Sequence, residues 1–185
     1  MMTPANRGMY NATVRRNDRL CDEHYRLEML ISDFPLSTPG QFVELHTQSA
    51  PVESGYTNLD WTTGEPPPQP KGVEFTSPQP FLRRPYSIAA RRTENGASVI
   101  DIIYRVIGKM TRQMEALQVH DSISVIGPLG HGFIIPEGAT RVILAGGGVG
   151  IPPMLYLASH LALRNIPTIA LIGVQKKTAF AIKLG

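Results

Sequence analysis

The sequence predicts an antiparallel β-barrel followed by the first part of a parallel α/β domain, a β plus α/β architecture. Six short runs rich in β-branched and aromatic residues occupy residues 9–127, and strands at such spacing are typical of a small barrel. Beyond residue 136 the order becomes apolar strand, glycine turn, helix and second apolar strand, which is that of a βαβ unit. We therefore expect a barrel domain over residues 1–135 and an incomplete α/β domain over residues 136–185.

The barrel strands are identified by short apolar or alternating runs, each bounded by Gly, Pro, Asn or Asp. They are expected at residues 9–15, 25–31, 41–47, 86–91, 98–106 and 122–127. A single helix is expected within residues 108–121, where Met114 and Leu117 share a helical face and Thr111 stands at the position of a side-chain cap. The segment 51–80 is polar and rich in proline, so we expect a surface insertion that buries no core.

The α/β part begins with the continuous apolar strand "TRVILA", residues 140–145, as expected for a strand covered on both faces. The glycine turn "GGGVG" leads into a helix over residues 151–165 with prolines in its first turn, where their missing N–H groups cost least. A second apolar strand follows at residues 168–174. One βαβ unit leaves apolar strand surface uncovered, so we expect this domain to be truncated.

Composition narrows the class of function. The chain has 185 residues, 42% hydrophobic residues and a net charge of +3 with no basic run, which argues against a nucleic-acid partner. A single cysteine, Cys21, excludes an internal disulfide framework and a cysteine-ligated cluster within this chain, and it suits a reducing, cytoplasmic compartment. The histidines lack metal-ligand spacing, so no metal site is expected. No apolar run reaches the ~18 residues that span a bilayer, so no membrane partner is expected either.

Three segments carry candidate chemistry. The first, "LRRPYSIAAR" at residues 82–91, gathers cations, an aromatic and a hydroxyl, although solvated arginines and an ordinary half-buried tyrosine would give the same pattern. The second, "IYRVIGKMT", feeds a strand into a helix start and suggests an anion site built from backbone donors.

The third segment is "AGGGVGIPP". Gly146 and Gly148 fit G-x-G, whereas Ile151 takes the third glycine's place and no acidic residue follows Glu137. A dinucleotide turn is thus one interpretation, and a turn that only packs helix on strand is the other.

Taken together and in order, "FLRRPYSI", "IYRVIGKMT", "GPLGHGF" and "LAGGGVGIPPM" resemble the ferredoxin reductase-like superfamily of flavoproteins. They are most similar to the family of electron-transfer subunits of NAD-linked dihydroorotate dehydrogenase. The resemblance implies a flavin-binding barrel followed by a domain that binds a nicotinamide nucleotide.

The resemblance also implies roles for single residues. Arg84 would pair with the flavin phosphate, Tyr86 would lie against the isoalloxazine, and Ser87 would approach the flavin N5 edge. Each role suits the side chain, since a guanidinium forks onto phosphate oxygens, an aromatic covers a ring, and a hydroxyl hydrogen-bonds a ring nitrogen. Pro85 would stiffen the backbone between them.

Further residues follow from the same resemblance. The adenosine side of the cofactor would be lined by Ile103, Tyr104 and Arg105, and its pyrophosphate received by Met110 and Thr111, which implies FAD rather than FMN. Relatives usually have glycine at the position of Met110. The nicotinamide nucleotide would meet Gly146, Gly147, Gly148, Gly150 and Pro152. No side chain is assigned as catalytic, because the flavin carries the chemistry.

The implied function is electron transfer through FAD between NAD(H) and a catalytic dihydroorotate dehydrogenase subunit in a hetero-oligomer, in the pyrimidine-biosynthetic oxidation of dihydroorotate to orotate. Full-length relatives also hold a 2Fe-2S cluster, whose cysteines are absent from this sequence. Two alternatives stay open: a ferredoxin- or hydrogenase-linked NAD(P)H reductase subunit, and a non-catalytic interaction module.

Overall fold

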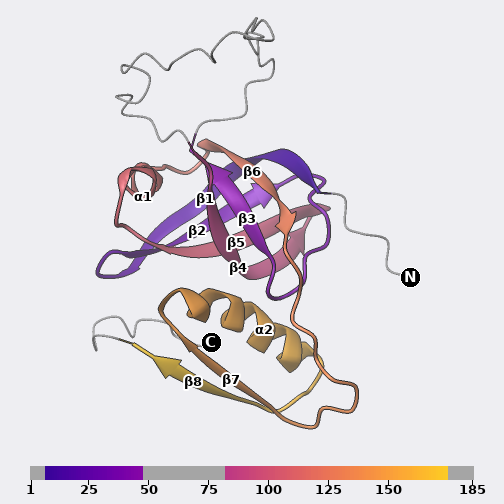
Figure 1. Ribbon diagram of the computed structural model, residues 1–185. Helices are drawn as coiled ribbons and strands as arrows, with labels where there is room; N and C mark the ends of the chain where they lie inside the picture. Colours follow the sequence, from indigo (N-terminus) through magenta and orange to yellow (C-terminus); the bar gives the residue numbers. More distant parts are fainter. Residues whose placement is uncertain (1–6, 48–81, 175–185) are drawn as a thin grey trace, which may run out of the picture.

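The structure is a computed structural model that describes residues 7–47 and 82–174. The predicted insertion at 51–80 lies outside the described residues. Within them, six antiparallel strands close a barrel in the order β1-β2-β5-β4-β3-β6 (Figure 1). Their bounds are β1 (Gly8–Cys21), β2 (His24–Ile31), β3 (Phe42–His46), β4 (Arg84–Glu94), β5 (Ala97–Arg105) and β6 (Ser122–Leu129).

The first strand is longer than its sequence pattern indicates. β1 continues through Asn17 and Asp18 to Cys21 and pairs with β2 over most of that length, so the predicted end at Arg15 is wrong. Two irregularities in the β1–β2 register, after Val14 and after Arg19, account for the difference, because bulges let a strand continue through residues that break regular alternation.

The barrel core is built from the inward-facing residues of neighbouring strands, which alternate with outward-facing ones. Leu27, Met29 and Ile31 of β2 and Ile100 and Ile102 of β5 are all fully buried. The short helix α1 (Lys109–Glu115) closes one end of the barrel, because its Met110 and Met114 side chains lie in the same core.

Helix α1 begins differently from the sequence-based expectation. Its N-cap residue is Gly108, and Thr111 lies in the first turn. The Thr111 hydroxyl oxygen accepts the backbone N–H groups of Ile107 and Gly108, at 2.9 and 3.0 Å. Thr111 therefore stabilises the helix start by reaching back to it, as the third residue of a capping box does, and not as the cap itself.

The α/β part follows the predicted order. β7 (Val142–Gly147), a single 3-10 turn (Gly148–Gly150), α2 (Ile151–Leu163) and β8 (Thr168–Gly173) succeed one another, and β7 and β8 are parallel. Leu144, Leu157 and Leu161 are buried between α2 and the sheet.

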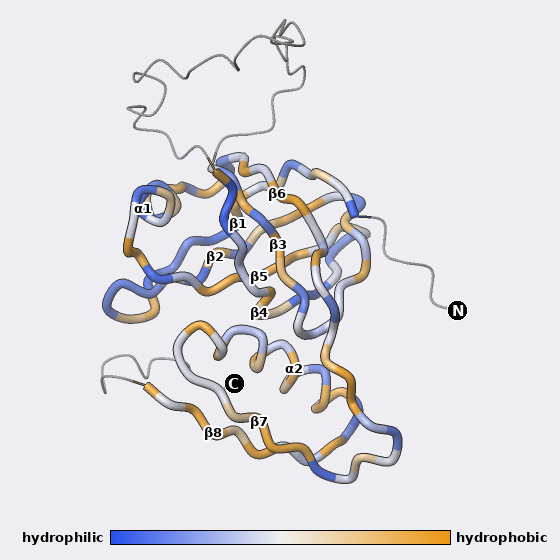
Figure 2. The backbone as a smooth tube through the Cα atoms, viewed as in Figure 1, coloured by the Kyte–Doolittle hydropathy of each residue, from blue (hydrophilic) through white to orange (hydrophobic). Residues whose placement is uncertain are grey.

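The opposite face of the β7–β8 sheet is open in the part of the chain that the structure describes. Ile143 and Leu171 are 62% and 58% exposed, and both strands are largely hydrophobic along their length (Figure 2). The closed antiparallel barrel and the parallel β7–β8 pair packed on α2 confirm the predicted β plus α/β fold class. Among the described helices, neither is long and apolar enough to cross a membrane.

Candidate functional site

The barrel wall opens where β4 begins. Residues Arg84–Ser87 pair with Leu45–Phe42 of β3, whereas pairing with β5 starts only at Ile88, opposite Ile102. The end of β5, residues 103–105, pairs with β2 on its other edge. The described segments 84–87 and 103–105 thus face one another without a strand ladder, which leaves backbone donors and acceptors available to a ligand.

The two neighbouring arginines of the opening segment have different surroundings. Arg83 reaches β6, where its guanidinium donates to the Ser124 hydroxyl at 2.7 Å and the Ser124 carbonyl at 3.2 Å. Burial lowers the pKa of Arg83. Arg84 is exposed, and within the described residues no hydrogen bond or ion pair engages its guanidinium. Arg83 therefore connects the start of β4 to β6, whereas the Arg84 guanidinium can bind an anion.

Three tyrosines form a row across the inner side of this opening. Tyr25 stacks on Tyr104 with ring centroids 5.6 Å apart, and Tyr104 meets Tyr86 edge-on at 6.5 Å. Burial raises the pKa of Tyr86 to about 12 and also raises that of Tyr104. Both phenols are therefore neutral at physiological pH, and Tyr86, which is only half-buried, offers an uncharged aromatic surface beside Arg84.

Polar contacts hold α1 against the same opening. The Thr47 hydroxyl, just beyond β3, donates to the Gln113 side-chain oxygen at 2.6 Å. The Tyr25 hydroxyl donates to Glu115 at 2.6 Å. Because Arg84 lies opposite Leu45, two residues before Thr47, these contacts bring the start of β4 and helix α1 to one end of the barrel.

One residue at the centre of these contacts, Asn17, was missed by the sequence reasoning. Its side-chain amide donates to the carbonyls of Met114, Glu115 and Leu117, at 2.7, 3.3 and 3.3 Å. Its side-chain oxygen accepts the Tyr104 hydroxyl at 3.0 Å. An asparagine within an alternating strand gives no sequence signal for this role, because its partners lie about a hundred residues away in the chain.

The side chains of the other residues predicted to contact the flavin differ in how accessible they are to a ligand. Tyr104 is 3% exposed and Met110 is 5% exposed, so both side chains belong to the core and can meet a ligand mainly through their backbone. Ile103 is half-buried. The Arg105 guanidinium is already paired with Glu23, at 2.8 and 3.0 Å.

The glycine turn lies between the end of β7 and the start of α2. Gly148 has φ +53°, a conformation that favours glycine. A Cβ on Gly146 would lie 3.2 Å from the Gly150 carbonyl oxygen. Pro152 follows within the first turn of α2 and carries no N–H. The backbone donors available here are consequently mainly those of the turn itself.

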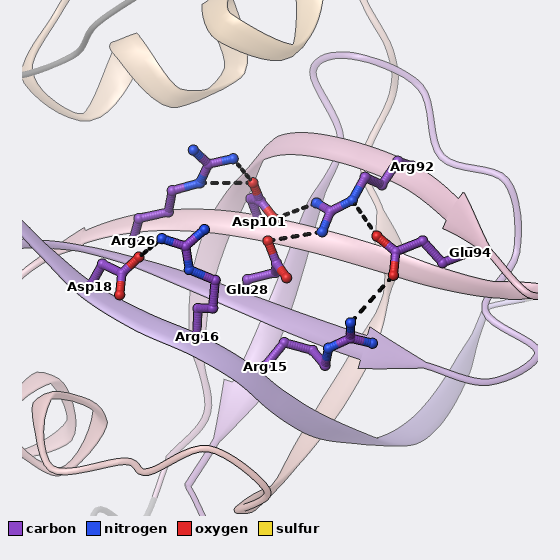
Figure 3. Close-up of polar contacts among 8 residues, drawn as sticks. All are labelled: Arg15, Arg16, Asp18, Arg26, Glu28, Arg92, Glu94 and Asp101. Atoms are coloured by element: carbon purple, nitrogen blue, oxygen red, sulfur yellow. Dashed lines mark hydrogen bonds and ion pairs between the residues drawn. The ribbon is translucent and has the colours of Figure 1, made fainter.

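A second cluster of charged residues lies on the outer wall of the barrel (Figure 3). Glu28 and Asp101 stand directly opposite each other on β2 and β5, and Arg26 and Arg92 pair with them. Burial raises the pKa of Asp101 against the opposing effect of Arg26. The arginines compensate two facing carboxylates, so this cluster is structural. Ion pairs extend the cluster through Arg92 to Glu94 and Arg15, and a separate ion pair, Arg16 with Asp18, lies beside it (Figure 3).

Comparison with known sequences identifies relatives. No family model matches the chain. It is 41% identical over 103 residues to the electron transfer subunit of dihydroorotate dehydrogenase B (NAD(+)) of Geobacillus thermodenitrificans, a match that covers 54% of this chain and 39% of that protein. The subunit of the same name from Fusobacterium nucleatum is 37% identical over 98 residues, or 52% of this chain and 37% of that protein. The chain is a homologue of these electron-transfer subunits. It spans less than half of their length.

Solved structures share the fold. A cytochrome P450 reductase of Amycolatopsis matches with a TM-score of 0.69 and 21% identity, over 97% of this chain and 47% of that one. The ferredoxin reductase of carbazole 1,9a-dioxygenase matches with a TM-score of 0.71 and 16% identity, over 98% and 47%. Phthalate dioxygenase reductase, described as a modular structure for electron transfer from pyridine nucleotides to [2Fe-2S], matches with a TM-score of 0.65 and 16% identity, over 94% and 46%. The fold is therefore that of the ferredoxin reductase-like proteins, as the sequence resemblance implied.

Proposed function

We propose that this chain is the FAD-binding part of an electron-transfer subunit that passes electrons between NAD(H) and a catalytic dihydroorotate dehydrogenase partner in the cytoplasm. The observation that carries the proposal is the opening at Arg84–Ser87, where a guanidinium with no partner among the described residues, a half-buried neutral phenol and strand edges without a ladder lie together. Identity near 40% to electron transfer subunits supports the partner and the nucleotide.

The residues of the opening fit a flavin. The Arg84 guanidinium is free to form a forked pair with phosphate oxygens, and Tyr86 offers a flat apolar face to a ring system. Ser87 is half-buried on the same strand and would donate or accept one hydrogen bond at the ring edge. The chemistry that a flavin held by these residues would supply is the uptake of electrons in pairs and their release one at a time, which amino-acid side chains lack.

A phosphate-sized site at the start of α1 would complete the cofactor site. Gly108 has no heavy atom near the position of a Cβ, so ligand atoms can approach the backbone there. Thr111 holds this helix start in place through Ile107 and Gly108, and the backbone N–H groups of Lys109 and Met110 would face the phosphate. At the other end, the backbone N–H groups of Gly148 to Gly150 would hold the nucleotide phosphate.

The proposal is tested by binding and by a matched pair of arginine variants. The chain reconstituted with FAD and with FMN is separated from free cofactor, and we expect FAD to bind at one per chain. Arg84→Ala should weaken FAD binding about 10- to 150-fold, the equivalent of losing a hydrogen bond to a charged group. Arg84→Lys should restore part of the loss, because it keeps the charge and loses the fork.

Arg83→Ala is the control, since Arg83 is engaged by Ser124. It should lower the denaturation midpoint and change FAD affinity less than about threefold. Absence of any flavin after reconstitution, or preferential binding of FMN, would contradict the proposal. Equal effects of the two alanine variants on affinity would remove Arg84 from the phosphate role.

A further inference from the structure

One aromatic residue of the α/β part packs against the hydrophobic core of the barrel. Tyr156 of α2 is 9% exposed and belongs to the hydrophobic cluster formed by the barrel strands. Its hydroxyl donates to the backbone carbonyl of Ser37 at 2.7 Å, and the Ser37 hydroxyl lies 3.4 Å away. α2 forms a layer between the barrel and the β7–β8 sheet (Figure 1), and among the barrel strands it packs mainly against β4.

The loop that receives Tyr156, residues 34–41, is itself fixed. The Gln41 side chain donates to the Gly130 carbonyl at 3.1 Å, and the Phe133 N–H donates to the Pro39 carbonyl at 2.8 Å. A Cβ on Gly132 would lie 2.4 Å from the Thr38 hydroxyl. The loop is thus clamped between the connection that leads to β7 and helix α2.

These contacts join the two candidate binding segments. The loop continues directly into β3, whose Phe42 pairs with Ser87 of the opening. Tyr156 lies on the helix whose N-cap residue, Gly150, belongs to the glycine turn. A rigid path therefore runs from the opening through β3, the loop and Tyr156 to the glycine turn.

We propose that Tyr156 is a positioning residue that fixes the glycine turn relative to the Arg84–Ser87 segment. The inference rests on the proposed function, in which these two segments hold the nicotinamide nucleotide and the flavin. Two parts joined by one connection otherwise move relative to each other, and transfer between two bound groups falls steeply when their separation is not maintained. A buried hydroxyl that donates to a main-chain carbonyl supplies this constraint without adding charge.

The test compares three hydroxyl deletions. Tyr156→Phe removes the hydrogen bond and keeps the ring. Ser37→Ala keeps the carbonyl that accepts the bond. Ser159→Ala removes an exposed hydroxyl from the same helix, where it donates to the Leu155 carbonyl at 3.1 Å. Amide hydrogen exchange is measured in α2 and in the barrel strands, and anaerobic flavin bleaching by NADH is measured for the FAD-loaded chains.

In Tyr156→Phe we expect α2 amides to exchange about tenfold faster while β1 and β2 amides are unchanged. The limiting rate of bleaching should fall about tenfold, with the half-saturating NADH concentration and the FAD affinity within about twofold of the unchanged chain. Ser37→Ala and Ser159→Ala should match the unchanged chain in all of these measurements.

The proposal is overturned if Tyr156→Phe behaves like Ser159→Ala, or if it speeds exchange without lowering the limiting rate, which would make Tyr156 a packing residue only. If the unchanged chain binds no FAD, the proposed flavin site is wrong. If it binds FAD but NADH does not bleach the flavin, the proposed electron transfer from NADH is wrong. In that case, α2 amides that exchange at the same rate in Tyr156→Phe and in the unchanged chain would still reject the role of Tyr156. Amide exchange can be measured without FAD or NADH.

Discussion

The contacts of Asn17 allow a quantitative prediction about how the barrel holds α1. Asn17→Ala removes the acceptor of the Tyr104 hydroxyl, which belongs to a side chain only 3% exposed. It also removes the donor to three carbonyls at the end of α1. An unpaired buried hydroxyl costs about 1–3 kcal/mol, so we expect the free energy of unfolding to fall by about 2 kcal/mol.

A double-mutant cycle separates the two contributions. Tyr104→Phe alone should cost about 1 kcal/mol, because the half-buried Asn17 side chain keeps its carbonyl partners. In the double variant no buried hydroxyl is left unpaired, so the combined loss should be smaller than the sum of the single losses by about 1 kcal/mol. Tyr25→Phe removes an exposed hydroxyl contact with Glu115 and should have a much smaller effect.

Urea unfolding followed by far-UV circular dichroism, with a common slope for all variants, measures these differences. Hydrogen exchange of the α1 amides should rise in Asn17→Ala more than in Tyr104→Phe, since a helix of seven residues depends on its tertiary contacts. Additive losses in the cycle would refute the reasoning, because they would mean that Tyr104 and Asn17 act independently. A loss below about 0.5 kcal/mol for Asn17→Ala would refute it as well.

Two further predictions concern Asp101 on the outer wall of the barrel and the contact between Gly132 and the loop at residues 34–41. Burial raises the pKa of Asp101 in the folded protein, so the folded state binds this proton more tightly than the unfolded chain, whose aspartates titrate near pH ~4. The contribution of this carboxyl to stability is therefore fully present below that pH and is lost as the pH rises through the folded pKa. Asp101→Asn should remove this loss of stability, measured by urea unfolding as the pH is raised from about 4; an unchanged pH dependence would contradict the prediction. Gly132→Ala places a Cβ 2.4 Å from the Thr38 hydroxyl and should lower the free energy of unfolding by about 1–3 kcal/mol. Gly138→Ala, with open space but φ +75°, is the comparison that has backbone strain without a clash. Equal losses of stability in the two variants would show that the clash is relieved at no cost.

The sequence by itself determined the order of elements and the segments that carry candidate chemistry. Alternating apolar residues placed the six barrel strands, and a continuous apolar run beside glycines placed the βαβ unit, because these patterns record which faces are buried. The four ordered motifs predicted the fold that the solved structures share. The same motifs predicted Arg84, Tyr86 and Ser87 as candidate site residues, since the motif that contains them is local.

Only the tertiary structure decided which of these residues are free and what holds them. The sequence could not separate Arg83 from Arg84, because the difference is a contact with Ser124 on a strand that follows much later in the chain. The sequence also did not indicate that Asn17 would bind the carbonyls at the end of α1, or that Tyr156 would pack against the hydrophobic cluster of the barrel. Hydrogen-bond partners and buried contacts between distant segments depend on how the chain closes in space, whereas periodicity and turn residues report only the local burial of each segment.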